Sequence, residues 1–518
     1  MIHLSYRKPK QLLRSSLPFF DGIRKIFLLV VFYCQVLAVQ ALPHISYTAE
    51  VDACYQNIIH LRIKEAEQQL AMLKSSDKDN LALLHLENYI DFFQLFITED
   101  LSEYKLRLPK KEVRMDKLES VQLKDPHLDF IKAEILLQWA LIQIKFDDKI
   151  SAGKAVYKAY QLLENNQKKY PSFKENNKSL SILHVLAESV PKWVRKLIGV
   201  KGSINQGKIE IESLAQFALS QKKYRYKDEV AAIYTYILFY QFNDRDGALN
   251  QLKKFSLDHS QHPLIAFLKA SIYQRAGKND DCLEVLNTLR LSPDQLPFHY
   301  LEFMKGKAYL NKQDARAKSH LLAFTKKFNG QHFIKEAYQK LAWYEMSMNN
   351  DVSLYKYYMA EVLKKGKALV DEDKQAEKEA LAGKPPIPFL LKSRLFYDGG
   401  YYSESYDVLR KNEKTLLQHA EYALEYYYRL GRVHQARNET KPAINCLKNT
   451  ILRGEKSNSY YAASAALQLG LIFEADAQWK VSSYYFQKCL SIDATEYKNS
   501  LHQKAKSGIQ RVQLKVVN

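Results

Sequence analysis

Apolar residues along most of this chain recur every three or four positions, the spacing of one face of an α-helix. Segment 81–97 is a long example, and segments 130–146 and 152–163 show the same period on either side of a short polar break. Two amphipathic segments joined by a short break are typical of an antiparallel helical hairpin. The pattern therefore predicts an all-α protein built from such hairpins.

A pairing of small and large residues recurs in the C-terminal part of the chain. Gly431 precedes Ala443 by twelve residues, and Leu447 follows four residues later. In a helical hairpin, a small residue lets the two helices cross closely, and a large residue one turn further on packs beside the crossing. The next unit repeats these spacings at Gly470, Ser482 and Phe486.

The same register extends backward through five more hairpins. Their separations are 34, 36, 36, 51, 38 and 39 residues, and all but one lie near the 34-residue unit of tetratricopeptide repeats. The chain resembles that repeat family, which implies a solenoid in which each hairpin packs on its neighbours in a superhelix. The predicted crossing positions on the first helices are Tyr236, Ala270, Gly306, Ala342, Ser393, Gly431 and Gly470.

A short apolar run near the N-terminus predicts an export signal. Arg24 and Lys25 precede the run 26–39, which at about 14 residues is too short for an ordinary membrane span and suits a signal-peptide core. The run leads into Val39-Gln40-Ala41, whose small residues predict cleavage after Ala41. We expect an exported, periplasmic or envelope-associated protein. An uncleaved N-terminal membrane anchor is the alternative.

The long separation between repeats contains a charged stretch that ends in Pro385-Pro386. This stretch predicts an inserted helix and loop, and the polar helix expected near the C-terminus suits a terminal cap. The predicted organisation is a signal peptide at 1–41, irregular N-terminal helical hairpins at 42–180, tetratricopeptide-like repeats at 181–370, the insertion at 371–388, and C-terminal repeats with a capping helix at 389–518.

Composition supports helices and limits the partners. Glycine (17 residues) and proline (14 residues) are scarce, although the turns of sheet-rich folds need both. The formal charge is +20, but the basic residues alternate with Asp and Glu and form no concentrated block. This pattern indicates a solvated surface rather than a nucleic-acid site, and leaves peripheral membrane association possible. Buried free thiols are expected at the widely spaced Cys54, Cys282, Cys446 and Cys489.

The segment around Pro191 carries a narrower resemblance. Pro191 follows the end of an apolar helix, and after a basic amphipathic turn come Gly199, Gly202 and Gly207. Over about residues 180–255 the chain resembles the eukaryotic tetratricopeptide family that includes the inclusion-body-clearance proteins of the mitochondrial outer membrane. The resemblance implies a non-enzymatic protein that acts through interactions with partners, lipid droplets or aggregates. The export signal departs from that family.

Three possible chemical sites are rejected on residue type. Gly202–Lys208 has the outline of a phosphate-binding loop, but Ile209 stands where a Ser or Thr would hold magnesium. These glycines instead predict a turn between helices, with positive φ angles and close packing. His259 and His262 lack a third metal ligand, and no nucleophile–base arrangement is visible. We therefore predict no catalytic residue, no metal and no cofactor.

The concave face of such a solenoid is lined by the first helix of each hairpin, and such a face suits a protein or peptide partner. The leading hypothesis is an exported, non-enzymatic scaffold, with no small-molecule substrate. The alternative is an envelope accessory protein that handles carbohydrate or lipid. The candidate groove contacts, all from the clearest repeat, are Tyr428, Arg429, Arg432, Gln435 and Arg437.

Overall fold

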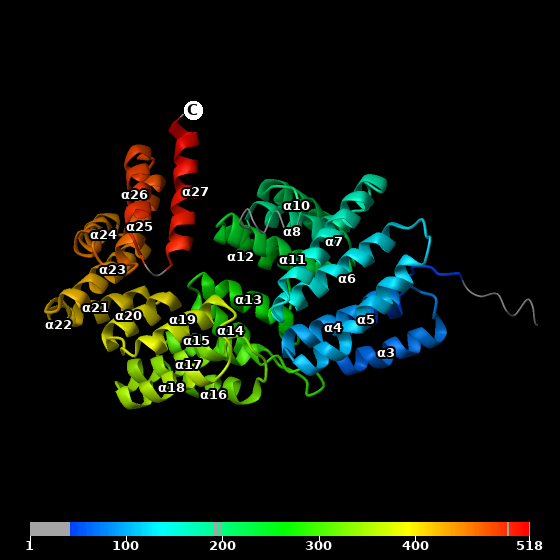
Figure 1. The fold of residues 1–518 in the computed structure, drawn as a ribbon, viewed down its shortest axis with the longest axis horizontal. Helices are drawn as coiled ribbons and strands as arrows, with labels where there is room; N and C mark the ends of the chain where they lie inside the picture. The colour runs from blue at the N-terminus through cyan, green and yellow to red at the C-terminus, as the bar shows by residue number, and fades with distance from the viewer. Residues whose placement is uncertain (1–41, 190–194, 196–198, 495–496, 517–518) are drawn as a thin grey trace, which may run out of the picture.

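The computed structural model describes residues 42–189, 195, 199–494 and 497–516, and within these it contains 25 α-helices and two π-helices. No strand forms in the described parts, where His44 and Asn80 make an isolated bridge. Figure 1 shows the helices following a curved path from α3, through α15 and α18, to α26 and α27. The predicted all-α solenoid of hairpins is confirmed. The predicted export signal, residues 1–41, lies outside the described residues.

The N-terminal helices pack as neighbouring hairpins, including the predicted pair from segments 130–146 and 152–163, which are α6 and α7. The predicted helix 81–97 is α4. These helices are α2 (Ala49–Ile59), α3 (Ile63–Ser76), α4 (Ala82–Thr98), α5 (Leu101–Glu119), α6 (Pro126–Lys145), α7 (Lys149–Lys169) and α8 (Asn176–Ser189).

The middle of the chain continues with five further hairpins, beginning with α8 and α10. Their helices are α10 (Ile204–Ser220), α11 (Lys227–Tyr236), η1 (Ile237–Gln241), α12 (Arg245–Lys254), α13 (Pro263–Arg275), α14 (Asn279–Thr288), α15 (Tyr300–Asn311), α16 (Arg316–Lys327), α17 (Ile334–Tyr344), η2 (Glu345–Asn349) and α18 (Val352–Lys364). The two π-helices each extend the first helix of a hairpin, as α11 and α17 run directly into them.

The C-terminal part contains three hairpins and a last helix that packs on α25 and α26, as expected of a cap. The elements are α19 (Asp371–Ala382), α20 (Pro388–Gly399), α21 (Tyr402–Lys411), α22 (Glu413–Leu417), α23 (Ala420–Ala436), α24 (Thr440–Gly454), α25 (Tyr461–Ala475), α26 (Trp479–Ser491) and α27 (Lys498–Val516). The predicted insertion contains α19, which packs against α17 and α18.

The small residues lie at the predicted crossings. A Cβ added to Gly431 would lie 3.0 Å from Cγ of Leu447, so a larger residue there would require the Leu447 side chain on α24 to shift. At the next crossing the Ser482 hydroxyl donates to the carbonyl oxygen of Gly470 at 2.8 Å. The first hairpin, whose sequence lacks a clear repeat, has a contact at the same spacing in the opposite direction: Cys54 Sγ donates to the carbonyl oxygen of Ala66, twelve residues later.

One predicted crossing is wrong. Tyr236 was expected where α11 crosses its partner, but its side chain is exposed, and Thr235 and Ile237 are buried instead. The cause is the π-helix η1, which begins directly after Tyr236. A π-helix holds more residues per turn than an α-helix, so it changes the spacing between the crossing residue on α11 and its partners on α12. The hairpin of α11 and α12 is present, whereas its register differs from the prediction.

The glycine-rich segment after α8 forms the turn predicted for it, as far as the structure describes it. Gly199 has φ +60° and Gly202 has φ +142°, both in the region that favours glycine. A Cβ added to Gly207 would lie 2.2 Å from the carbonyl oxygen of Ser181, so α10 and α8 approach through this glycine. The Ser203 side chain then caps α10 by accepting a hydrogen bond from the Gln206 N–H.

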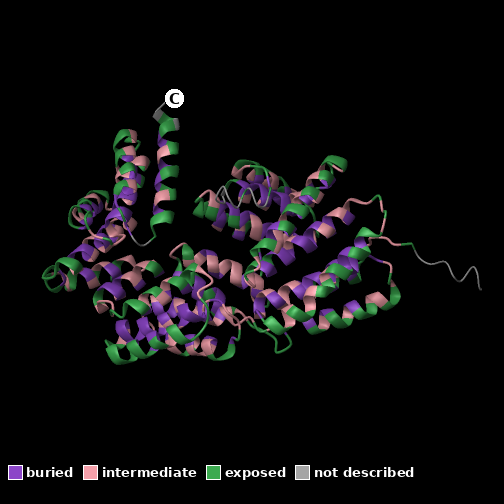
Figure 2. Ribbon diagram, viewed as in Figure 1, coloured by how far each residue is buried: buried purple, intermediate pink, exposed green. Residues whose placement is uncertain are grey.

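The core is a succession of apolar clusters rather than one centre, as expected when repeats contact mainly their neighbours. In Figure 2 the buried residues follow the inner faces of the paired helices along the whole path. Contacts between distant repeats supplement these clusters. The Leu296 N–H donates to the carbonyl oxygen of Leu61 at 2.8 Å, which joins the loop after α14 to the first hairpin.

Candidate functional site

A groove of about 720 Å³ runs along the first helices of successive hairpins, from η1 past α13, α15 and α17 to α20. Its walls carry aromatic side chains that offer flat apolar surface, together with scattered charges. Tyr240 is typical: its exposed ring packs 4.7 Å from the ring of Tyr236, and the Arg275 guanidinium lies over it at 5.4 Å. The aromatic lining consists of Tyr236, Tyr240, Phe267, Tyr300, Phe333, Trp343 and Tyr497.

The inserted helix α19 forms one wall of this groove. The Glu379 carboxylate accepts hydrogen bonds from Trp343 Nε1 at 2.8 Å and from Gln339 Nε2 at 2.6 Å. Asp373 is fully buried and caps the start of α17 by accepting from the N–H groups of Phe333 and Glu336. Burial raises the pKa of Asp373 to about 6. The insertion is therefore a packed part of the concave face.

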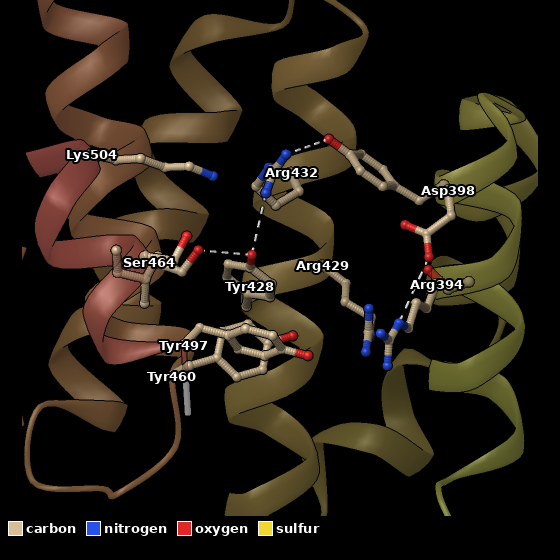
Figure 3. Close-up of a pocket in the computed structure, with 13 residues that line it drawn as sticks. Arg394, Asp398, Tyr428, Arg429, Arg432, Tyr460, Ser464, Tyr497 and Lys504 are labelled. Carbon is tan, nitrogen blue, oxygen red and sulfur yellow. Dashed lines mark hydrogen bonds and ion pairs between the residues drawn. The ribbon is translucent and has the colours of Figure 1, made fainter. Parts of the chain in front are cut away.

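A second pocket, of about 270 Å³, lies between α20, α23, α25 and α27. It shares Arg394, Asp398 and Tyr497 with the larger groove, so the two cavities adjoin one another. Figure 3 shows its lining side chains converging from these helices. We call this second cavity the C-terminal pocket.

Three of the five predicted contact residues line the C-terminal pocket: Tyr428, Arg429 and Arg432. Arg432 donates to the Tyr397 hydroxyl at 2.8 Å and to the Tyr428 hydroxyl at 3.3 Å. The Tyr428 hydroxyl also lies 3.0 Å from the Ser464 hydroxyl, which ties α23 to α25. Arg429 pairs with Glu425 on its own helix.

Gln435 and Arg437 are not among the residues that line either cavity. Arg437 lies at the C-terminal end of α23, where it pairs with Glu439 at 3.0 Å and packs over the ring of Tyr406. Arg437 follows the pocket-lining Arg432 by five residues, which places it about 140° around the helix axis and so away from the pocket.

The prediction missed most of the residues that complete the pocket. These residues come from helices other than α23. A signal for the first of them was present in the repeat register, because Arg394 directly follows the crossing residue Ser393 as Arg432 follows Gly431. Ser393, predicted only as a crossing residue, also lines the pocket, and the other missed lining residues are Arg394, Tyr397, Asp398, Tyr460, Ser464, Tyr497, Ser500, Leu501 and Lys504.

Charged and hydroxyl groups dominate the C-terminal pocket. Burial and the nearby charge of Arg429 act to lower the pKa of Arg394, but Asp398 raises it, and the net shift is upward. Burial has the opposite effect on the Tyr397 and Tyr460 phenols and raises their pKa, so both stay protonated near neutral pH and can donate hydrogen bonds. The pocket therefore combines fixed positive charge with neutral donors.

The rejected sites have ordinary structural settings. Lys208 lies within α10, with its ammonium 4.7 Å from the centre of the Phe242 ring. The His262 ring caps α13 and lies 4.2 Å from the tilted ring of His60, whereas His259 makes a hydrogen bond with Thr288. The described part of the chain holds no group of three or more His, Cys, Asp or Glu side chains placed to bind a metal.

Two further features concern the burial of the cysteines and whether any described helix could cross a membrane. Cys54, Cys282 and Cys489 are buried free thiols, as predicted, whereas Cys446 is half-buried. Burial raises the pKa of the Cys282 thiol to about 12, which keeps it protonated. Among the helices that the structure describes, none combines the length and the apolar character that a membrane crossing needs.

No protein-family model matches this chain, and no curated protein matches it either. Among solved structures, the chain is similar to one described as "Structure of Naa15/Naa10 bound to HypK-THB". The identity is 10%, the TM-score is 0.19, and the match covers 91% of this chain and 80% of that one. With so low a TM-score, the solenoid described above rests on this chain's own helices.

Proposed function

We propose that this chain is a non-enzymatic scaffold that holds an extended segment of a partner protein in its concave groove. The observation that carries the proposal is the groove along successive hairpins, which the C-terminal pocket adjoins at Arg394, Asp398 and Tyr497. A groove that follows successive hairpins suits an elongated ligand better than a compact metabolite, because its lining is spread over several first helices. Aromatic rings beside charged groups provide both apolar contact and orientation.

Replacement of Tyr240 by alanine is expected to weaken peptide binding about tenfold, because an exposed aromatic anchor often carries more than 1 kcal/mol of binding energy. Since the ring is exposed, its loss should leave folding intact. Short random peptides displayed on phage and retained by the mature chain serve as the probe, and their affinities are measured by fluorescence anisotropy.

The matched control is Tyr357→Ala, which removes an exposed tyrosine of α18 that lines neither cavity. Equal effects of the two substitutions, or failure to retain any peptide, would contradict the groove as the binding surface. The alternative of an envelope accessory protein for carbohydrate or lipid stays a prediction.

We also propose that the mature scaffold lies outside the cytoplasm. The support is the basic Arg24-Lys25, the apolar run 26–39 and the small residues of Val39-Gln40-Ala41. The N-terminal residue of the protein isolated from its natural source is expected to be Leu42. Met1 would instead indicate a retained anchor. Recovery of the whole repeat array in the cytosol would refute export and favour the resemblance of residues 180–255 to the cytosol-facing family.

A further inference from the structure

The two cavities differ in their balance of charge. In the larger groove the cations Arg275, Lys307, Lys340 and Arg394 face the anions Glu336, Asp371, Glu372, Glu379 and Asp398. In the C-terminal pocket, four cations face only the Asp398 carboxylate among its lining residues. Those cations are Arg394, Arg429, Arg432 and Lys504. The concave face therefore ends in a pocket of positive charge.

Arg432 is a partly buried cation of this pocket that lacks a carboxylate partner among the described residues. Its guanidinium donates instead to the hydroxyls of Tyr397 and Tyr428. Its Nε is buried without a hydrogen-bond partner. A guanidinium that is partly withdrawn from water and held by neutral groups costs free energy, and an incoming anion would offset that cost.

The other groups are arranged to assist the same ligand. Figure 3 shows the Arg394 and Arg429 guanidinium groups directed toward one another, and Lys504 reaching from α27 toward Arg432. Arg394 holds Asp398 only loosely, at 3.7 Å. Guanidinium groups present paired N–H donors that match the oxygens of a carboxylate or a phosphate. Tyrosine hydroxyls around them add neutral donors.

We propose that the C-terminal pocket binds an oxyanion, a carboxylate or a phosphate, carried by the protein segment that occupies the groove. The proposal rests on the proposed function, and it adds the chemistry that the partner must have. Because the pocket adjoins one end of the groove, the bound oxyanion fixes the register of the segment along the aromatic lining. A partner segment without an anionic group at this point lacks the anchor.

The pocket is tested first without a peptide. Inorganic phosphate and acetate are titrated separately into the mature chain, and thermal unfolding is followed by circular dichroism. We expect at least one of them to raise the melting temperature of the wild type, by an amount that grows with the logarithm of its concentration once that exceeds Kd. The rise should be lost in Arg432→Gln and reduced in Lys504→Gln. Because the Lys504 side chain is exposed, misfolding would not explain a reduced response of that variant. Arg437→Gln, outside the pocket, should behave as the wild type.

The second test uses the peptides retained on the groove. Peptides with Asp, Glu, phosphoserine or a free terminal carboxylate are compared with their Asn, Gln, Ser or amidated counterparts, which separates the sources of the oxyanion. Arg432→Gln should weaken the binding of the anionic peptides about tenfold or more, because a hydrogen bond to a charged group contributes a free energy in that range. It should leave the neutral counterparts unchanged.

The outcomes separate the two proposals. Peptides bound equally well with or without the anion, in wild type and Arg432→Gln alike, would overturn the oxyanion pocket and leave the groove function standing. Failure to retain any peptide, with an Arg432-dependent response to phosphate or acetate, would overturn the groove function and the idea that a peptide carries the oxyanion. An absent or Arg432-independent response to both ions would overturn the pocket itself.

Discussion

Replacement of Lys178 by methionine is expected to lower the free energy of unfolding by about 3–5 kcal/mol, the usual cost of removing one partner from a buried ion pair. The Lys178 ammonium is 1% exposed and lies 2.7 Å from Glu134 Oε2 and 2.6 Å from Glu229 Oε2. It also lies 4.6 Å from the centre of the Tyr226 ring. Its loss leaves two carboxylates without their cation where α6, α8 and α11 meet.

The control for Lys178 is another lysine in an ion pair, at the surface. Lys158 lies 2.7 Å from Glu119, but both side chains are about half exposed, so Lys158→Met should cost less than about 1 kcal/mol. Urea unfolding monitored by circular dichroism gives both values, and hydrogen exchange shows whether the α8 amides open first. Similar costs for the two variants would mean that the buried network contributes no more than a surface pair.

Much of the groove could be predicted once the repeat register was known. The residue that follows the crossing position lines a cavity in five repeats: Ser271, Lys307, Trp343, Arg394 and Arg432. This regularity arises because the crossing residue faces the second helix of its hairpin, and the next residue is rotated about 100° around the helix. A stripe of groove residues thus follows from the stripe of small residues.

Other features depend on partners that no local pattern connects. Lys178 and its two carboxylates come from three helices, and each alone resembles a surface residue of an amphipathic helix. The groove wall formed by α19 depends on Asp373, whose partners lie about forty residues earlier in the chain. The crossing predicted at Tyr236 is wrong for a different reason. The π-helix η1 interrupts the helical period on which the repeat register depends.

A buried carboxylate joins the N-terminal hairpins to the middle of the solenoid. Glu99 ends α4, and its Oε2 accepts hydrogen bonds from the N–H groups of Gln331 and His332 at 2.8 and 3.0 Å and from His332 Nδ1 at 2.7 Å. Its Oε1 pairs with Lys145. Burial alone would raise the pKa of Glu99, but His332 and Lys145 lower it to about 2.

Glu99→Gln is therefore expected to lower the free energy of unfolding by about 2–3 kcal/mol near neutral pH, because the ionised carboxylate makes charge-assisted hydrogen bonds that an amide cannot. The folded pKa is depressed, so this stabilisation is complete above the ordinary value of 4.5 and is lost as pH falls toward about 2. The difference between wild type and variant should narrow across that window, because glutamine does not titrate.

Urea unfolding at several pH values measures this difference, and faster hydrogen exchange at the start of α17 should accompany it at neutral pH. The control Glu119→Gln removes a carboxylate from a half-exposed pair and should change stability by less than about 1 kcal/mol. A constant difference between Glu99→Gln and wild type from neutral pH to pH 3 would show that the charge of Glu99 does not hold the two parts together. A narrowing difference would instead identify Glu99 as the acid-sensitive link between hairpins that lie 232 residues apart in the chain.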